Sequence, residues 1–328
     1  MKKHTRFIQT LWTCLVASAA LIASVNASAQ SQSGYPNRPI KMIVPFGTGG
    51  GYDGIARLIA DKMSEFLKQR VIVENKAGAA GNIGAEAAMK APPDGYTVIL
   101  AGDFLTSNPF LYPHIQWDPD RDLEAISFFG RTPRVIVARP SLGANTLPEL
   151  IKLSQQQDLS YSTPGVGTGP HLLMELLKME YGFKGTHVPY KGNSQAAQDA
   201  IGGHVDMVVA PLPAVIGFVK ANRLSGVVLF SAKRSPQKPD LAVPSEYGMK
   251  GLEGDQWYAL FAPKGTPEEI LALLNKSVIA AMTPEVKASL LVNGYDAEPS
   301  TRAELKQLVR TSRDHWGKVI KAMNLPPQ

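Results

Sequence analysis

Short apolar runs alternate with amphipathic stretches in the first third of the chain. Ile40–Val44 is an apolar run of strand length, and Val71–Glu74 and Tyr96–Leu100 are two more. Between the first two, the 3.6-residue spacing of apolar positions predicts a helix from about residue 53 to 68. Its buried face is expected to contain Ile55, Leu58, Ile59, Met63, Phe66 and Leu67. A glycine-containing loop at 77–84 then opens a helix that reaches Lys90. Repeated strand–helix–strand units predict an α/β fold with a mostly parallel sheet.

The same pattern restarts at Val135–Val137. Strands are expected near 159–162, 205–209 and 226–231, and helices at 171–180 and 213–221. Thr146 and Glu149 have capping-box spacing, which predicts a helix start. Helices that begin near Thr266, Thr283 and Thr301 are expected to return to the first lobe. We therefore predict two lobes, the first made of residues 30–131 and 236–328 and the second of residues 132–235.

The N-terminus has the pattern of a secretory signal peptide. Lys2, Lys3 and Arg6 precede an apolar stretch, and Ala27-Ser28-Ala29 matches a small-x-small cleavage site. We expect residues 1–29 to be removed by cleavage before Gln30, which places the mature protein in the periplasm. A retained membrane anchor is the alternative. Cys14, the single cysteine, would be lost with this segment, so no disulfide is expected.

Composition excludes one class of partner. The formal charge is +6, and loss of three cations with the signal peptide lowers it to +3. No run of Lys or Arg typical of nucleic-acid binding is present, so no nucleic-acid partner is expected.

Two glycine-rich loops carry the strongest chemical signal, and each follows a strand and precedes a helix. They are Gly47-Thr48-Gly49-Gly50-Gly51 and Gly165-Val166-Gly167-Thr168-Gly169. Such loops expose backbone N–H groups at the positive end of a helix dipole, where anions bind. Each loop could instead be only a tight turn. The formal G-x-G-x-x-G match at 49–54 is weak evidence for a dinucleotide, because the chain is expected to be exported; no cofactor is predicted.

The sequence offers little support for catalysis. It contains no H-E-x-x-H, G-x-S-x-G or paired-cysteine motif. His171 and Glu175 share a helix face and could suggest a metal, but a histidine that bonds its own loop is favoured. Asp53 could be a general base, but a first-turn carboxylate is favoured. We expect a protein that is not an enzyme and keep a secreted hydrolase or isomerase as the alternative.

Several ordered motifs, spread from about Tyr35 to Pro326, resemble a known family. They include Ile43-Val44-Pro45-Phe46, Val73-Glu74-Asn75-Lys76, Pro93-Asp94-Gly95-Tyr96-Thr97, His187-Val188-Pro189-Tyr190-Lys191-Gly192 and Ser231-Ala232-Lys233-Arg234. The chain is similar to the Bug family, the substrate-binding proteins of tripartite tricarboxylate transporters. The resemblance implies a type II periplasmic-binding-protein fold that holds a carboxylate between the loops at 46–53 and 163–171. It also implies delivery to integral-membrane permease subunits.

The chain departs from the family pattern at two points. Gly47-Thr48 stands where the family usually has two prolines, and Ala210-Pro211 stands where many members have an acid. The missing acid argues against an amino-acid ligand. Phe104 and Trp257 could line the ligand cleft, or they could be ordinary residues of the hydrophobic core.

The expected function is capture of a di-, tri- or aromatic carboxylate by a monomeric solute-binding protein. A sensor that presents its ligand to a membrane kinase is a further alternative. The expected ligand-binding residues are Phe46, Gly47, Thr48, Gly49, Gly50, Asp53, Asp103, Phe104, Thr163, Gly165, Gly167, Thr168, Gly169, His171, Tyr190, Pro211 and Leu212.

Overall fold

The computed structural model describes residues 34–48 and 51–323. The expected signal peptide and two residues of the first loop, Gly49 and Gly50, lie outside these ranges. None of the helices in the described ranges has the length and apolar composition needed to cross a membrane. Residues 34–38 form a short bend with a cis peptide bond between Tyr35 and Pro36, and the remaining described residues form two sheets and their helices.

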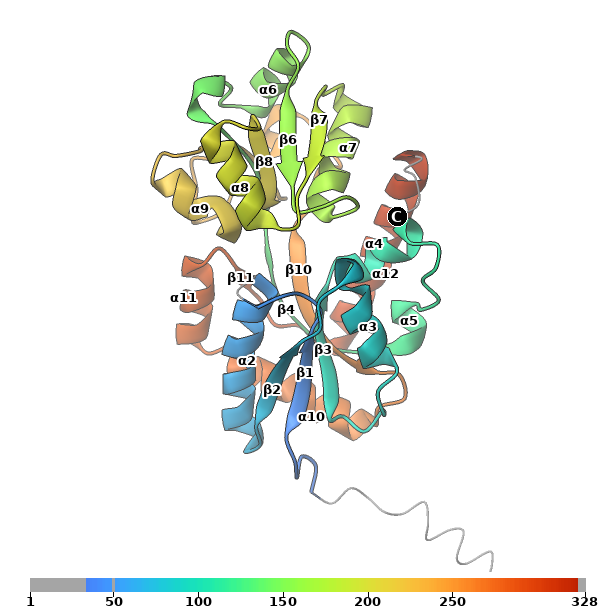
Figure 1. The fold of residues 1–328 in the computed structure, drawn as a ribbon. Coiled ribbons are helices and arrows are strands. Elements are labelled where there is room, and N and C mark those ends of the chain that lie inside the picture. The colour runs from blue at the N-terminus through green and yellow to red at the C-terminus, as the bar shows by residue number, and fades with distance from the viewer. Residues whose placement is uncertain (1–33, 49–50, 324–328) are drawn as a thin grey trace, which may run out of the picture. The chain divides into compact units, whose positions relative to one another are not determined.

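The first sheet has six strands in the order β11-β4-β10-β3-β1-β2. Its strands are β1 (Ile40–Val44), β2 (Val71–Asn75), β3 (Thr97–Gly102), β4 (Leu123–Thr132), β10 (Gln256–Pro263) and β11 (Asp296–Ala297). Its helices are α2 (Gly51–Leu67), α3 (Asn82–Met89), α4 (Phe104–Leu111), α5 (Pro119–Asp122), α10 (Glu268–Ala281), α11 (Pro284–Val292) and α12 (Arg302–Met323) (Figure 1). We call this sheet with its helices lobe 1.

The second sheet has five strands in the order β7-β6-β8-β5-β9. They are β5 (Arg134–Ala138), β6 (Ser160–Thr163), β7 (Thr186–Pro189), β8 (Met207–Pro211) and β9 (Ser225–Phe230). The helices are α6 (Leu147–Ser154), α7 (Gly169–Tyr181), α8 (Asn193–Gly202) and α9 (Leu212–Lys220). We call this group lobe 2. The chain passes from the first sheet to the second through Pro133, and it returns between Phe230 and Gln256.

Most strands of each sheet run in one direction, as predicted, but both sheets also contain antiparallel strands that the prediction missed. β1, β2 and β3 are parallel, as are β6, β7 and β8, but β10 runs antiparallel to β3 and β4, and β5 runs antiparallel to β8 and β9. β5 is the first strand after the chain crosses to the second sheet, and β10 is the first strand after it returns. Both sheets are therefore mixed, which a pattern of local strand–helix units does not reveal.

Local signals placed the helix starts well. The Thr146 hydroxyl accepts from the Glu149 N–H (3.3 Å), while the Glu149 carboxylate bonds the N–H of Asn145 rather than that of Thr146. Thr301 and Glu304 form the complete reciprocal box. The predicted face of α2 is wrong in part, because Phe66 is 43% exposed and Leu58 is only half-buried.

The C-terminal helices pack on lobe 1 as predicted, and α12 also reaches lobe 2. α10 contacts α2 and β4, and α12 contacts α4 and β4. Near the end of α12, Trp316 and Ile320 join the hydrophobic cluster that contains Leu172 and Leu173 of α7. The end of α12 therefore forms a buried apolar contact between the two lobes.

Candidate functional site

The β1–α2 loop is held in place by one side-chain amide. Asn75 Nδ2, at the end of β2, donates to the Phe46 carbonyl (3.0 Å) and to Asp53 Oδ1 (3.0 Å). Arg57, one turn along α2, donates through Nε to Asp53 Oδ2 (3.1 Å). Asp53 is thus a buried first-turn carboxylate that positions the loop. Its hydrogen-bond partners are Asn75 and Arg57, which agrees with the first-turn role that the sequence favoured over that of a general base.

A row of aromatic rings extends from this loop across lobe 1. The Phe46 and Tyr52 ring centroids are 4.5 Å apart, Tyr52 and Tyr258 are 4.8 Å apart, and Tyr258 and Tyr295 are 5.6 Å apart. Phe104 meets Phe46 edge-on at 5.5 Å. Burial raises the pKa of Tyr52 and of Tyr258, and it raises the pKa of Tyr295 to about 12. At neutral pH the row is therefore uncharged.

The β6–α7 loop is supported mainly by its own side chains. The Thr163 hydroxyl donates to the Gly165 carbonyl (3.1 Å), and the Thr168 hydroxyl donates to the same carbonyl (2.7 Å). The Gly167 N–H donates to His171 Nδ1 (3.1 Å). Gly167 has a φ of +74°, a region that favours glycine. These hydroxyls and this imidazole fix the shape of the loop, and His171 has the loop-bonding role that we favoured.

Behind the loop, two histidines and a tyrosine form a stack. The His171 and His187 rings are 4.1 Å apart, and His187 lies 5.1 Å from Tyr161. Burial lowers the pKa of His171, and burial together with the nearby His171 lowers the pKa of His187 to about 4. Both imidazoles are therefore neutral at pH 7. The chain as far as it is described holds no group of three or more His, Cys, Asp or Glu placed to bind a metal.

Arg134 is the residue on which the candidate site converges, and the sequence analysis did not select it. It starts β5, is 2% exposed, forms an ion pair with Asp103 through Nη2 and donates through Nη1 to the Gly254 carbonyl. Its guanidinium also lies against Gly169, the first residue of α7. A Cβ at Gly169 would stand 2.8 Å from Arg134 Nε and closer still to Cζ and Nη2. Gly169 is therefore required for space.

A series of contacts links the two loops. Phe46 of the first loop packs on Phe104, which directly follows Asp103. Asp103 pairs with Arg134, and Arg134 lies on Gly169 at the end of the second loop. A continuous path of neighbouring groups thus joins the start of α2 to the start of α7, across the lobes.

The other predicted residues differ in their placement. Pro211 is directly opposite Arg134 in the β5–β8 register. The hydroxyl of Tyr190 bonds Asp199 on α8 (2.5 Å), so it is engaged within lobe 2. Leu212 is 1% exposed within the core of lobe 2, and Trp257 is 5% exposed beside Phe261.

Gly47 and Thr48 are exposed on the first loop. Gly49 and Gly50, also expected to bind the ligand, lie outside the described residues.

A cavity of about 390 Å³ lies where the chain crosses between the sheets. Arg131, Pro133 and the Ser231–Pro236 segment line it, together with Asp255 and Tyr295. Tyr295 also ends the aromatic row, so the row leads from the first loop to this hinge pocket. Its volume is within the range of small-molecule sites. Asp255 faces it with a pKa that burial raises.

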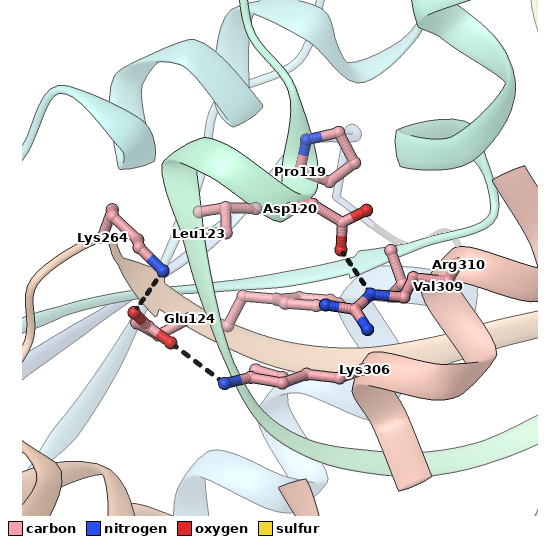
Figure 2. A pocket seen from close by; sticks show the side chains of 10 residues that line it. Pro119, Asp120, Leu123, Glu124, Lys264, Lys306, Val309 and Arg310 are labelled. Atoms are coloured by element: carbon pink, nitrogen blue, oxygen red, sulfur yellow. Dashed lines mark ion pairs between the residues drawn. The ribbon is translucent and has the colours of Figure 1, made fainter. Parts of the chain in front are cut away.

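A second cavity, of about 90 Å³, lies in lobe 1 under α12. Figure 2 shows Glu124 between Lys264 (2.8 Å) and Lys306 (3.5 Å), and Asp120 facing Arg310 (3.9 Å). Its charged side chains are paired with one another, and it is smaller than most small-molecule sites. We do not assign it to ligand binding.

Known proteins agree with this architecture. The family model described as the tripartite tricarboxylate transporter family receptor matches residues 55–325. Protein BugT of Bordetella pertussis is 32% identical over 311 residues, which cover 93% of this chain and 94% of that protein.

Two solved structures are also similar. Rpa4515 of R. palustris, solved with adipate, is 31% identical with a TM-score of 0.83, covering 90% of this chain and 100% of that one. MatC of Rhodopseudomonas palustris, solved with bound malate, is 28% identical with a TM-score of 0.78, covering 87% and 100%. The chain has the two-lobed periplasmic-binding-protein fold and belongs to the tripartite tricarboxylate transporter receptor family, to which the Bug proteins also belong.

Proposed function

We propose that this protein is an extracytoplasmic solute-binding protein that captures a small organic carboxylate and delivers it to an integral-membrane permease. The observation that carries the proposal is the junction at Arg134, where a buried cation meets the first turn of α7. We place the ligand's carboxylate at this junction, between the β1–α2 and β6–α7 loops. A cation and free N–H groups at one point are suited to an anion.

The energetics favour such a site. A carboxylate that leaves water loses its hydration, so several hydrogen bonds to the charged form must replace it. Helix α7 offers N–H groups that have no acceptor in its first turn. The first intrahelical bond of this turn is the Leu172 N–H to the Thr168 carbonyl (3.0 Å). The uncharged aromatic row beside Phe46 would then accommodate the carbon skeleton of the ligand.

The relatives support the same class of ligand. Rpa4515 was solved with adipate and MatC with malate, and both ligands are dicarboxylates. Tricarboxylates and aromatic carboxylates remain within the proposed class. We also propose that the mature protein begins at Gln30, acts in the periplasm as a monomer, and closes about the two crossings near Thr132 and Ala232.

An enzyme on the same scaffold is the competing proposal, and the site gives it less support. The Asp53 carboxylate is engaged by Asn75 and Arg57, and His171 Nδ1 is engaged by the Gly167 N–H. Neither group is poised as a base next to a nucleophile. A sensor would differ from a transport receptor only in its membrane partner.

A thermal-shift screen over mono-, di-, tri- and aromatic carboxylates tests the proposal, followed by mass spectrometry of the recovered ligand. We expect stabilisation by at least one carboxylate and recovery of that compound unchanged. Recovery of a converted product would support the enzyme. If no carboxylate raises the melting temperature, and neutral analogues do not raise it either, the proposal is contradicted.

A further inference from the structure

The strongest unexplained feature of the site is a donor that has no acceptor. Arg134 Nε is buried and has no hydrogen-bond partner among the described residues, although Nη1 and Nη2 are both engaged. A buried donor without a partner is rare in native proteins, and it calls for an absent acceptor. The Nε–H belongs to the edge of the guanidinium that also carries Nη2, the edge that commonly binds a carboxylate oxygen pair.

The position of this donor indicates what the acceptor is. Nε lies beside Gly169, at the N-terminus of the 13-residue helix α7. Gly169 and His171 contribute first-turn N–H groups there, and Pro170 between them has none. One cationic donor and two backbone donors thus gather at the positive end of a helix dipole. Their natural complement is a carboxylate oxygen.

The charges around Arg134 decide what else the ligand can carry. Asp103 already accepts from Nη2, and Asp255, the other acid near Arg134, lines the hinge pocket. β8 ends in Ala210-Pro211, and Pro211 is opposite Arg134, so this position provides no acid to receive an ammonium group. An ammonium on the carbon next to the carboxylate would face the guanidinium. Its available counter-charge would be Asp255, whose Oδ1 has no hydrogen-bond partner among the described residues, but burial raises the pKa of Asp255 and so penalises its charged form.

We propose that Arg134 selects the ligand: its Nε–H and the first turn of α7 receive one carboxylate, and its charge excludes α-amino acids in favour of dicarboxylates without an amino group. The inference rests on the proposed function. It adds which residue selects the ligand and which class of carboxylate is excluded. Asp103 holds the guanidinium in place and lowers the net positive charge that the ligand meets. Asp103 is thus a positioning residue that weakens anion binding while it orients Arg134.

Calorimetric titration of adipate and of 2-aminoadipate into four proteins tests this: the wild type, Arg134→Met, Arg134→Lys and Asp103→Asn. We expect the wild type to prefer adipate at least tenfold. Arg134→Met should lose adipate affinity by tenfold or more and lose the preference as well. Arg134→Lys keeps the charge but not the Nε–H, so it should bind adipate more weakly and still reject the amino acid. Circular dichroism verifies that each variant is folded.

Asp103→Asn is the matched variant at the other end of the ion pair. Asparagine Oδ1 can still accept from Nη2, so the guanidinium should stay in place while one negative charge is lost. We expect adipate affinity to rise several-fold. A loss of adipate affinity equal to that of Arg134→Met would mean that the Arg134–Asp103 ion pair only stabilises the fold. That result would overturn the inference.

The outcomes separate this inference from the proposed function. If the wild type binds adipate or another carboxylate and Arg134→Met and Arg134→Lys bind it equally well, the inference is wrong and the proposed function stands. If the wild type binds 2-aminoadipate more tightly than adipate, the charge argument is wrong. If the wild type binds no carboxylate at all, the proposed function fails and this inference fails with it.

Discussion

Replacing Gly169 by alanine removes the space in which the Arg134 guanidinium lies. The new Cβ would stand 2.8 Å from Nε and closer to Cζ and Nη2, which real Cβ atoms do not tolerate. Arg134 is 2% exposed and is engaged by Asp103 and the Gly254 carbonyl, so its side chain has little freedom to move aside. The substitution must therefore strain or break the buried ion pair between the lobes.

Two contributions set the change in the free energy of unfolding: the loss of the ion pair and the gain in helix propensity. Breaking a buried ion pair costs about 3–5 kcal/mol. Alanine recovers up to about 1 kcal/mol of helix propensity relative to glycine, and less at a first-turn position. The free energy of unfolding should therefore fall by about 2–4 kcal/mol, a drop in Tm of roughly 5–10 °C. Urea unfolding and calorimetric melting measure these two quantities.

Gly217→Ala is the matched control within lobe 2. Gly217 lies inside α9, and a Cβ there would meet no atom within 4 Å. The same chemical change should raise stability by up to about 1 kcal/mol, since alanine is the better helix former. Opposite signs for the two substitutions are the expected result. A Gly169→Ala protein that unfolds at or above the wild-type temperature would refute the account of Arg134 given above.

Three further predictions follow from the loops and their supports. Asn75→Ala should lower the free energy of unfolding by about 1–3 kcal/mol, because the Phe46 carbonyl and a buried carboxylate each lose a donor; unchanged urea unfolding would contradict this. Gly167→Val should abolish carboxylate binding in calorimetry with the fold retained by circular dichroism, since φ is +74° there; wild-type affinity would count against the loop model. The lowered pKa values of His171 and His187 mean that the unfolded chain binds these protons more tightly than the folded protein. The stability that His187 contributes is present above about pH 6.5 and is lost as the pH falls towards 4, by at most about 1.4 kcal/mol per pH unit, and His171 acts in the same direction. Melting temperatures of the wild type and His187→Gln across this range measure the effect, and equal slopes would contradict it.

The sequence predicted the elements of the fold because their signals are local. Apolar spacing located α2 and α7, and Thr283 and Thr301 marked the starts of α11 and α12 through their side-chain caps. The antiparallel strands were not predicted, because their place depends on which distant strand enters between neighbours. β10 lies between β3 and β4 although more than 120 residues separate it from either in the chain, and no local pattern encodes that insertion.

The candidate site was predicted in part for the same reason. The glycine loops and Asp103 are visible as motifs or strand ends, and the structure places Asp103 and Gly169 on either side of the Arg134 guanidinium. Arg134 was missed because it stands before Val135-Ile136-Val137, where a single cation resembles the exposed flank of a strand. The only available signal was the unusual start of a fully buried strand with an arginine. Recognising its role required the partner, Asp103, which is 31 residues away in sequence.

A crystal structure of the complex with the tightest-binding carboxylate from the screen would show directly whether Arg134 and the first turn of α7 hold the ligand. We predict a carboxylate of the ligand with its oxygens within about 3 Å of Arg134 Nε and of the first-turn N–H groups of α7. The carbon skeleton should lie along the aromatic row that begins at Phe46. A ligand found instead only in the hinge pocket beside Asp255 and Tyr295, with Arg134 Nε still unpaired, would contradict the account.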